Sequence, residues 1–483
     1  MKKSLIFFLI TIMLLPPLPR TVHSASPDAL WDNTSVSAGG FDSNYYLSDK
    51  NHNSYAKSAS EASVTLENSS KIAHIYIIFD RIYGEWTLTD NATKRSVTVG
   101  KDGFLHEYIS ITDIFGTECE SLTLSFESNV AISEVYGFTE GKLPDWVQIW
   151  EKPLEKADIL LLSSHSDDEQ LFFAGVLPYY AGERKADVQV VYLINHFDTH
   201  NRPHEQLDGL WTVGVKNYPI ISDFPDLYSE SLDGAISAFE NAGISYQAIE
   251  EFIVENIRRF KPQVLVTHDI EGEYGHGTHI LCTNIVMNVL PSTADRTFYP
   301  KSAVMYGEWD VPKTYLHLYD ENTITMNWDI PLDAFGGKTA FEMTLKGFEC
   351  HKSQHWTWFS DWIRGSEADP VTKASDISAY SPCKYGLYRS TVGADVFGGD
   401  FLENITLYKD MPIPEPEQTT VETTLKSDDS TTETANAQNS DDSTTKSTPN
   451  PFVFICILVC VSLLTIVVYF AVETRYKSKK RKM

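Results

Sequence analysis

The chain has two short polar segments whose residue types suit metal chemistry. The first is SHSDDE at residues 164–169, directly after the apolar run DILLLS at residues 158–163. Because His165 and Asp168 are three residues apart where a strand passes into a helix, both side chains can converge on one point. Imidazole nitrogen and carboxylate oxygen are common zinc ligands, and a catalytic zinc needs three protein ligands with one position open for water. Asp167 remains free beside such a metal, where it can take a proton from that water.

The second polar segment is EYGHGTH at residues 273–279, which follows the apolar run QVLVT and the residues His268 and Asp269. His276 and His279 supply a third ligand and one spare imidazole. Each segment has a plainer interpretation, because acidic residues also cap helices and histidines also lie on helix surfaces. Since both segments follow apolar strands and carry complementary ligands, the pair favours metal binding.

Apolar strands alternate with helical stretches from about residue 155. The sequence predicts strands at residues 158–163, 188–194 and 263–267, and helices at residues 168–180 and 202–213. Strands that alternate with helices indicate an α/β domain with a parallel, Rossmann-like sheet, which we place at residues 155–408. Ligands of such sheets collect at the carboxyl ends of the strands, where both polar segments begin.

Residues 27–145 have a different pattern, with short alternating strands separated by polar turns. This predicts a β-sandwich, which resembles the discoidin or galactose-binding-like modules, most clearly in the last strand at residues 130–138. Trp86 or Tyr83, if exposed, would suit stacking on sugars; the alternative is that both belong to the sandwich core.

The two polar segments together resemble the signature motifs of the PIG-L (LmbE-like) family of zinc-dependent N-acetylglucosaminide deacetylases, usually HPDDE and HPDH. Two further elements agree. The RPHE segment at residues 202–205 is similar to the R-x-x-E helix of the family, and Lys346 with the HKSQ segment at residues 351–354 is similar to a late K-x4-H-x-S-Q element. The resemblance covers about residues 155–400.

The resemblance implies a role for six residues. His165, Asp168 and His279 would bind one zinc ion, Asp167 would be the general base, His276 would stabilise the oxyanion or protonate the leaving amine, and Tyr274 would help to polarise the acetyl carbonyl. Two residues depart from the family pattern, Ser166 in place of proline and Thr278 in place of aspartate. A carboxylate that orients His276 must therefore come from elsewhere, with Asp269 and Glu273 as candidates. The polar residues His196, Asp198, His200 and His204 either line the substrate pocket or form a surface loop.

The two ends of the chain indicate export and anchoring. Residues 1–24 read as a secretory signal peptide, and residues 452–472 as a transmembrane helix. The basic tail at residues 473–483 places the earlier domains outside the cell, on a Ser/Thr/Asp/Glu-rich stalk at residues 411–450. The formal net charge of -27 disfavours nucleic acid as a partner. Cys350 and Cys383 are the first pair to test for a disulfide.

These observations predict a membrane-anchored enzyme that removes the N-acetyl group of an amino sugar in a glycan or glycoconjugate outside the cytoplasm. Two alternatives stay open. One is a non-catalytic surface adhesin or glycan-binding protein whose α/β domain is a retired enzyme, and the other is a zinc amidase that acts on a peptide or lipid amide. The sequence does not select the substrate.

Overall fold

The structure, a computed structural model, describes residues 27–412. The predicted signal peptide at 1–24, transmembrane helix at 452–472 and basic tail at 473–483 lie outside the described residues, as does nearly all of the stalk. Within residues 27–412, no helix is long and apolar enough to cross a membrane. All described residues belong to one compact unit, Met1–Ile413.

The first part of the chain folds into two β-layers. Its strands are β1 (Ser35–Phe41), β2 (Ala56–Ile72), β3 (His74–Phe79), β4 (Trp86–Asp90), β5 (Ser96–Val99), β6 (His106–Ser110), β7 (Cys119–Phe126) and β8 (Ala131–Phe138), with helix α1 (Ile111–Phe115) between β6 and β7. The pairing order is β5-β4-β7-β2-β8-β3-β6, with β1 on β2. The long strand β2 pairs with β7 in one layer and with β8 in the other, so it belongs to both.

The alternating pattern of these strands builds the core between the two layers. Leu122, Leu124 and Phe126 of β7 are buried while their neighbours are more exposed, as expected for a strand with one face in the core. Each such side chain contributes roughly 1.5–3 kcal/mol when it is fully buried. Trp86 also belongs to this core, with 2% of its surface exposed, so of the two interpretations of Trp86 the core one is confirmed. Tyr83 is partly buried and stacks on Phe79.

The second part of the chain contains one seven-stranded sheet. Its strands are β9 (Ile159–Ser163), β10 (Val188–Tyr192), β11 (Ile220–Ile221), β12 (Val264–Thr267), β13 (Lys313–His317), β14 (Thr323–Thr325) and β15 (Lys384–Ser390). The helices are α2 (Asp168–Leu171), α3 (Arg202–Thr212), α4 (Leu232–Asn241), α5 (Tyr246–Phe260), α6 (Gly277–Val289), α7 (Pro300–Tyr306), α8 (Ala340–Cys350) and α9 (Trp358–Arg364).

The order of the strands places a switch point at the centre of this sheet. The order is β11-β10-β9-β12-β13-β15-β14. From β9 the chain moves outward through β10 to β11, and it then returns to add β12 on the other side of β9. Loops that leave neighbouring strands in opposite directions open a crevice at their carboxyl ends, and ligands of α/β proteins bind there. The two polar segments follow β9 and β12.

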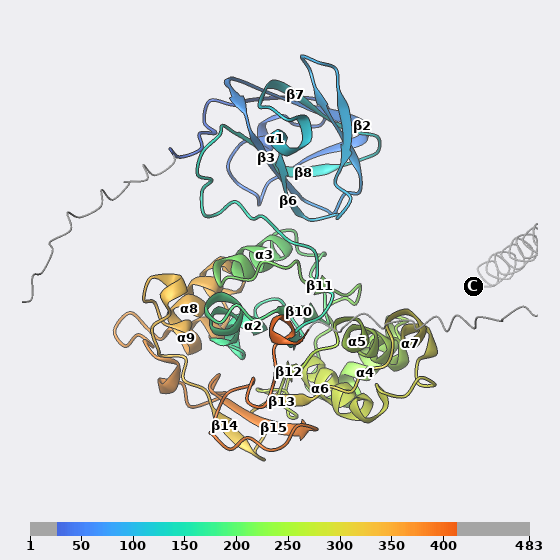
Figure 1. The fold of residues 1–483 in the computed structure, drawn as a ribbon, viewed down its shortest axis with the longest axis vertical. Coiled ribbons are helices and arrows are strands. Elements are labelled where there is room, and N and C mark those ends of the chain that lie inside the picture. Colours follow the sequence, from blue (N-terminus) through green and yellow to red (C-terminus); the bar gives the residue numbers. More distant parts are fainter. Residues whose placement is uncertain (1–26, 413–483) are drawn as a thin grey trace, which may run out of the picture. The chain divides into compact units, whose positions relative to one another are not determined.

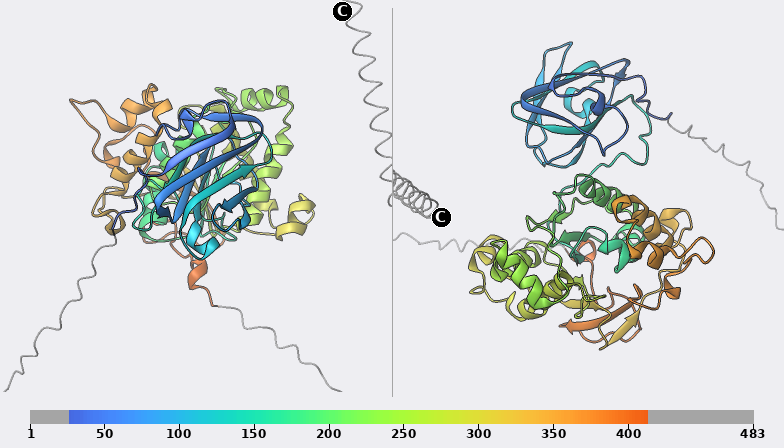
Figure 2. Two further views of the ribbon diagram at one scale, coloured as in Figure 1. Left: turned by 90° about the horizontal axis from the view of Figure 1, so that it is seen from above. Right: turned by 180° about the vertical axis from the view of Figure 1, so that it is seen from behind.

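Helices cover both faces of the sheet (Figure 1), and the same two layers are visible from behind (Figure 2). Leu160 and Leu162 of β9 pack toward α4, α5 and α6 in one apolar cluster. Ile159 and Leu161 pack with residues of α2, α3 and α8 in another. Because both faces are covered, the central strands β9 and β12 are apolar at nearly every position, as the runs in the sequence indicated.

Three expectations from the sequence need correction. The sheet is mixed rather than wholly parallel, because β15 pairs antiparallel with β13, and β14 with β15. The helix expected at residues 168–180 is interrupted: α2 ends at Leu171, Gly175 adopts a positive φ of 88°, and a π-helix, η2 (Pro178–Glu183), follows. Cys350 and Cys383 are free thiols, so the disulfide considered between them is not formed.

The sandwich contacts the α/β domain through several specific interactions. The Leu105 backbone N–H donates a hydrogen bond to the Tyr218 hydroxyl at 3.1 Å, and Phe104 stacks on the Tyr218 ring. Arg81 donates to the carbonyl of Phe197 at 2.6 Å. The loop after β10 therefore lies against the sandwich.

A buried carboxyl group of the sandwich makes stability depend on pH. Glu107 accepts a hydrogen bond from Trp86 Nε1 at 3.0 Å, and burial raises the pKa of Glu107 to about 7. The stability that neutral Glu107 provides is fully present below pH about 4.5 and is lost as the pH rises through about 7. Glu107→Gln keeps an acceptor for Trp86 without the charge, so we expect it to stabilise the protein at pH 8 by up to roughly 3 kcal/mol, but not at pH 4.

Denaturant unfolding of the Glu107→Gln protein at pH 4 and pH 8 measures this difference. The exposed Glu127→Gln substitution in the same domain is the matched control, and it should leave the pH dependence unchanged. Equal stability of Glu107→Gln and wild type at pH 8 would contradict the prediction.

Candidate metal centre

Three predicted ligands converge at the carboxyl ends of β9 and β12. His165 Nδ1 lies 3.2 Å from Asp168 Oδ2 and 3.1 Å from His279 Nε2, and His279 Nε2 lies 3.2 Å from Asp168 Oδ2. Ligand atoms at about 2.0–2.1 Å from a tetrahedral zinc are about 3.3 Å apart. The three side chains are buried. Their donor set and spacing therefore fit one tetrahedral metal ion with a fourth position left for water.

Two other histidines lie close enough to be alternative ligands. Groups of potential ligands also include His276 with His165 and His279, and His268 with Asp168 and His279. His268 Nε2 already accepts a hydrogen bond from the Ser164 backbone N–H at 2.8 Å, so its lone pair is used. Asp168 contacts both His165 and His279, whereas no direct bond joins His276 to the other ligands. We therefore retain His165, Asp168 and His279 as the ligand set.

Glu273 is the carboxylate that contacts the candidate ligand His279 and two further histidines. Its Oε2 accepts from His279 Nδ1 at 2.7 Å, and its Oε1 accepts from His317 Nδ1 at 2.9 Å, while His268 Nδ1 lies 3.2 Å from both oxygens. Burial raises the pKa of Glu273, but His268 and His279 outweigh it and hold that pKa well below its usual range. An ionised Glu273 keeps the proton of His279 on Nδ1 and leaves Nε2 free for a metal.

Asp226 has a similar position beside His165. Its carboxylate lies 3.5 Å from His165 Nε2 and 3.6 Å from His196 Nδ1. His196 in turn accepts from the Ser166 backbone N–H at 3.3 Å. Asp226 follows the short strand β11, far from either motif in sequence, and no spacing pattern pointed to it. His196 is thus buried against the first polar segment rather than part of a surface loop.

Asp167 lies beside the ligand set in a strained backbone conformation. Its φ is 119°, which a residue with a side chain rarely adopts, and its carboxylate is buried. Burial raises the pKa of Asp167 to about 7, although Arg202 lies 3.7 Å away and lowers it. Arg202 also donates to the Ser166 carbonyl at 2.8 Å, which fixes the loop. A carboxylate with a pKa near 7 suits a general base.

His276 and Tyr274 lie beside the ligand set. The Thr278 backbone N–H donates to His276 Nδ1 at 3.2 Å, which places the proton of the neutral ring on Nε2. Neither Asp269 nor Glu273 orients His276, because Glu273 contacts His268, His279 and His317 instead. The rings of Tyr274 and His276 lie 5.7 Å apart, and burial raises the pKa of Tyr274, so its hydroxyl stays protonated.

The RPHE segment at residues 202–205 and the HKSQ segment at residues 351–354 contact the first polar segment and each other. Glu205 accepts two hydrogen bonds from Ser353, at 2.9 Å from the backbone N–H and 2.6 Å from the hydroxyl. His351 Nε2 lies 3.3 Å from Glu169 Oε1, and both residues are buried. Four segments that are distant in sequence therefore meet at one centre.

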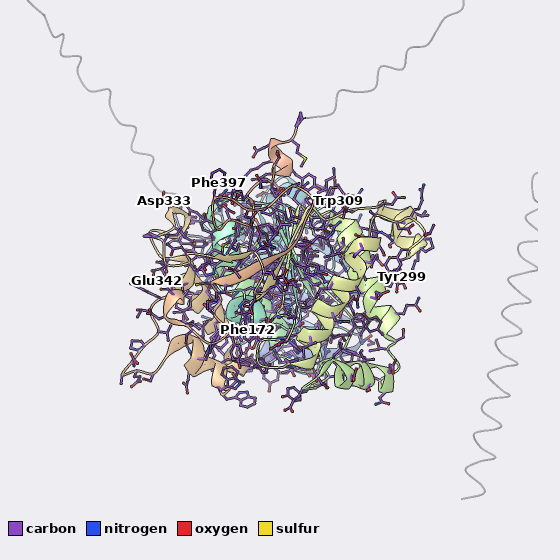
Figure 3. All side chains as sticks on the ribbon, turned by 90° about the horizontal axis from the view of Figure 1, so that it is seen from below. Phe172, Tyr299, Trp309, Asp333, Glu342 and Phe397 are labelled. Carbon is purple, nitrogen blue, oxygen red and sulfur yellow. The ribbon has the colours of Figure 1, made fainter. Side chains whose placement is uncertain are left out.

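An aromatic cluster lies next to the centre. Phe172 contacts His279 and Tyr274 at ring separations of 5.6 and 6.0 Å; it is buried, and Figure 3 labels it. Tyr274 continues the cluster toward Trp358 and Phe359 of α9. Trp358 is 47% exposed, so the cluster reaches the surface. Such rings can exclude water and offer faces for stacking.

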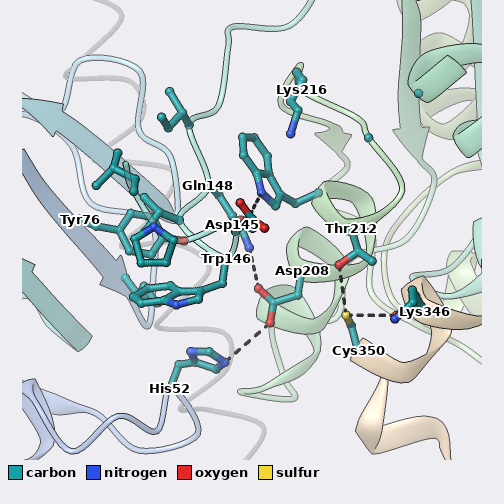
Figure 4. Close-up of a pocket in the computed structure, with 18 of the residues that line it drawn as sticks. His52, Tyr76, Asp145, Trp146, Gln148, Asp208, Thr212, Lys216, Lys346 and Cys350 are labelled. Carbon is teal, nitrogen blue, oxygen red and sulfur yellow. Dashed lines mark hydrogen bonds and ion pairs between the residues drawn. The ribbon is translucent and has the colours of Figure 1, made fainter. Parts of the chain in front are cut away.

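A cavity of about 1180 Å³ lies away from the ligand set, between the sandwich and helices α3 and α8 (Figure 4). Its lining includes Trp146, Trp211 and Asp208 but none of His165, Asp168 and His279. The size of a cavity therefore does not identify the reaction site, and we assign the metal centre from its donor atoms.

His200 and His204 turn away from the centre. His200 Nδ1 contacts Asp80 of the sandwich, and His204 Nδ1 lies 2.9 Å from His106 Nε2. Asp198 is exposed. Of the four polar residues after β10, only His196 contacts the first polar segment.

Comparison with known proteins gives a family match within the α/β domain. The family model described as "GlcNAc-PI de-N-acetylase" (PIG-L) matches residues 160–290, which contain both polar segments. The match supports the PIG-L resemblance, whereas the likeness of the sandwich to discoidin modules stays a prediction.

Similar proteins include two deacetylases. A 1D-myo-inositol 2-acetamido-2-deoxy-alpha-D-glucopyranoside deacetylase of Catenulispora acidiphila is 36% identical over 178 residues, which cover 35% of this chain and 50% of that protein. One of Streptomyces scabiei is 38% identical over 180 residues and covers 32% and 54%. The chain spans about half the length of these relatives. An N,N'-diacetylchitobiose deacetylase structure from Pyrococcus horikoshii has a TM-score of 0.35 at 13% identity and covers 49% and 85%.

The contacts of Glu273 lead to a prediction about the zinc affinity of the centre. Glu273→Gln keeps the shape but offers one acceptor and one donor to three imidazoles, so His279 loses its fixed tautomer. We expect zinc affinity to fall by about 10–100-fold, as for other residues that hold a metal ligand. Competition with a chelator measures it.

The control for this test is Glu271→Gln, which changes an exposed carboxylate of the same loop. Its zinc affinity should equal that of wild type. Circular dichroism establishes that the Glu273→Gln protein is folded. A folded Glu273→Gln protein with wild-type affinity would show that Glu273 does not act on the metal.

Proposed function

We propose that this protein is a zinc-dependent N-deacetylase that hydrolyses the N-acetyl group of an N-acetylglucosamine-containing glycan or glycoconjugate. The observation that carries the proposal is the convergence of His165, Asp168 and His279 within 3.1–3.2 Å of one another, with Asp167 beside them. The family match at residues 160–290 and the deacetylases that resemble this chain support the same chemistry.

The chemistry that zinc supplies, when bound, is a pKa near 7 for its water and polarisation of the acetyl carbonyl. The residues of the chain do the rest. Asp167 takes the proton of the attacking water, for which its raised pKa and buried position suit it. Arg202 holds the Asp167 loop through the Ser166 carbonyl.

His276 and Tyr274 act on the other side of the acetyl group. The N–H at His276 Nε2 points away from the Thr278 N–H, and it donates a hydrogen bond to the developing oxyanion. As the carbon–nitrogen bond breaks, the leaving amine takes the proton that Asp167 received from the water, and acetate is released. The Tyr274 hydroxyl donates to the carbonyl oxygen.

The aromatic cluster supports a sugar substrate. Tyr274 and Trp358 continue from the centre to the surface, where a pyranose ring can pack its apolar face on an aromatic ring. This favours an amino sugar over a peptide or lipid amide.

The proposal includes a location outside the cytoplasm. The signal-like segment at residues 1–24 and the apolar segment at residues 452–472 support an exported protein tethered by its C-terminal helix. The substrate would then be a glycan of the cell surface or its surroundings.

The role of Asp167 can be tested by Asp167→Asn, which keeps the shape and suits the positive φ but cannot accept a proton. We expect kcat/KM for acetate release from N-acetylglucosaminides to fall by about 10²–10⁴-fold, while zinc content stays unchanged. Acetate release and metal analysis on the same preparation measure both quantities.

Asp233→Asn, on the exposed first turn of α4, is the control and should retain full activity. A wild-type protein that binds glycans but releases no acetate would instead support the glycan-binding alternative. Turnover on peptide or lipid amides, without turnover on amino sugars, would support the amidase alternative.

A further inference from the structure

A second cluster of potential metal ligands lies where the α/β domain meets the sandwich. Asp80 directly follows β3 of the sandwich, His200 lies in the loop before α3, and His204 lies in the first turn of α3. One ligand atom from each of the three side chains lies within 4.8 Å of the others. The cluster shares no residue with the centre formed by His165, Asp168 and His279.

Two imidazole nitrogens of this cluster are buried without a hydrogen-bond partner. They are Nε2 of His200 and Nε2 of His204. His204 is 1% exposed, so water does not reach it freely. A buried polar atom without a partner destabilises the fold, whichever tautomer is present. Two such atoms beside one carboxylate point to a cation as the missing partner.

The hydrogen-bond partners on the Nδ1 side of His204 resemble those of a histidine that binds a metal through Nε2. His204 Nδ1 lies 2.9 Å from His106 Nε2, and His106 Nδ1 lies 2.9 Å from the Tyr76 hydroxyl. If His204 donates its Nδ1 proton to His106, the lone pair of His204 Nε2 is free. Imidazoles that bind metals donate their other N–H to an acceptor in this way.

Asp80 is suited to be the charged ligand. Its side chain is 6% exposed, and its Oδ1 contacts His200 Nδ1. The Arg81 side chain, 3.6 Å from Asp80 Oδ2, is 57% exposed and therefore neutralises Asp80 weakly. Two imidazoles with one carboxylate form a ligand set that zinc accepts.

We infer that Asp80, His200 and His204 bind a second divalent metal ion, most simply zinc, which joins the sandwich to the α/β domain. His200 is partly exposed, so water can complete the coordination. Since Asp80 comes from one domain and both histidines come from the other, the ion crosslinks them. The role is structural, and it does not depend on the proposed deacetylase activity.

Metal analysis of the full-length protein tests this inference. We expect two zinc ions per chain in wild type, one in His200→Ala, one in His279→Ala and none in the double variant. His200 lies in a partly exposed loop, so its replacement leaves the core intact; Asp80→Asn, which keeps the size of the side chain, should also remove one ion. Circular dichroism checks that each variant is folded.

His52→Ala is the matched control. The His52 ring, from the sandwich, lies 5.9 Å from that of His204 at the same junction, but His52 is not in the ligand group. This variant should keep both ions. In the His279→Ala protein, added Co²⁺ should give visible absorption bands from the second site alone, and the His200→Ala/His279→Ala protein should lack them.

Equal zinc content in wild type and a folded His200→Ala protein would overturn the inference. A wild-type protein with a single ion that His279→Ala removes would overturn it as well. Loss of an ion in His200→Ala but not in His279→Ala would support the second site and contradict the catalytic one, so the two assignments fail separately.

Discussion

The metal centre depends on one buried carboxylate, that of Glu273. It lies behind His279 and contacts the imidazoles of His268 and His317 as well, so three rings are oriented around one charge. His268 in turn accepts from the Ser164 backbone at the end of β9. Because β9 and β12 are neighbours in the sheet, Glu273 connects the segments that follow both strands. A buried charge of this kind persists only when it is fully hydrogen-bonded.

The switch point of the sheet brings these segments together. Residues 164–169 and 273–279 are about a hundred positions apart in sequence, yet β9 and β12 end side by side. The helices on both faces bury the strands, and this leaves the carboxyl edge as the place where polar side chains can gather. Arg202 of α3 and His351 after α8 then support the segment after β9, and Glu205 joins α3 to the segment after α8 through Ser353. The strained Asp167 is held by these contacts.

The convergence of the candidate ligands was predictable because each motif directly follows an apolar strand, and such strands share an edge. His165, Asp168 and His279 meet as their spacing suggested. Asp226 was not predictable, since a loop residue that approaches through space leaves no periodic signal. The sequence left Asp269 and Glu273 as candidates to orient His276, because spacing cannot tell which of several nearby imidazoles a carboxylate contacts. Trp86 is buried because its indole N–H finds Glu107 inside the sandwich, a pairing that strand patterns do not reveal.

The loop between β10 and α3 has histidines at both of its ends, and they face different neighbours. His196 contacts the first polar segment, while His200 contacts Asp80 of the sandwich. His204 extends this contact to His106. A chimera that joined this α/β domain to a sandwich without Asp80 and His106 would leave His200 and His204 facing a surface that no longer matches them. The two domains are therefore expected to occur together in related proteins. In such proteins, Asp80 and His106 of the sandwich should change together with His200 and His204 of the α/β domain.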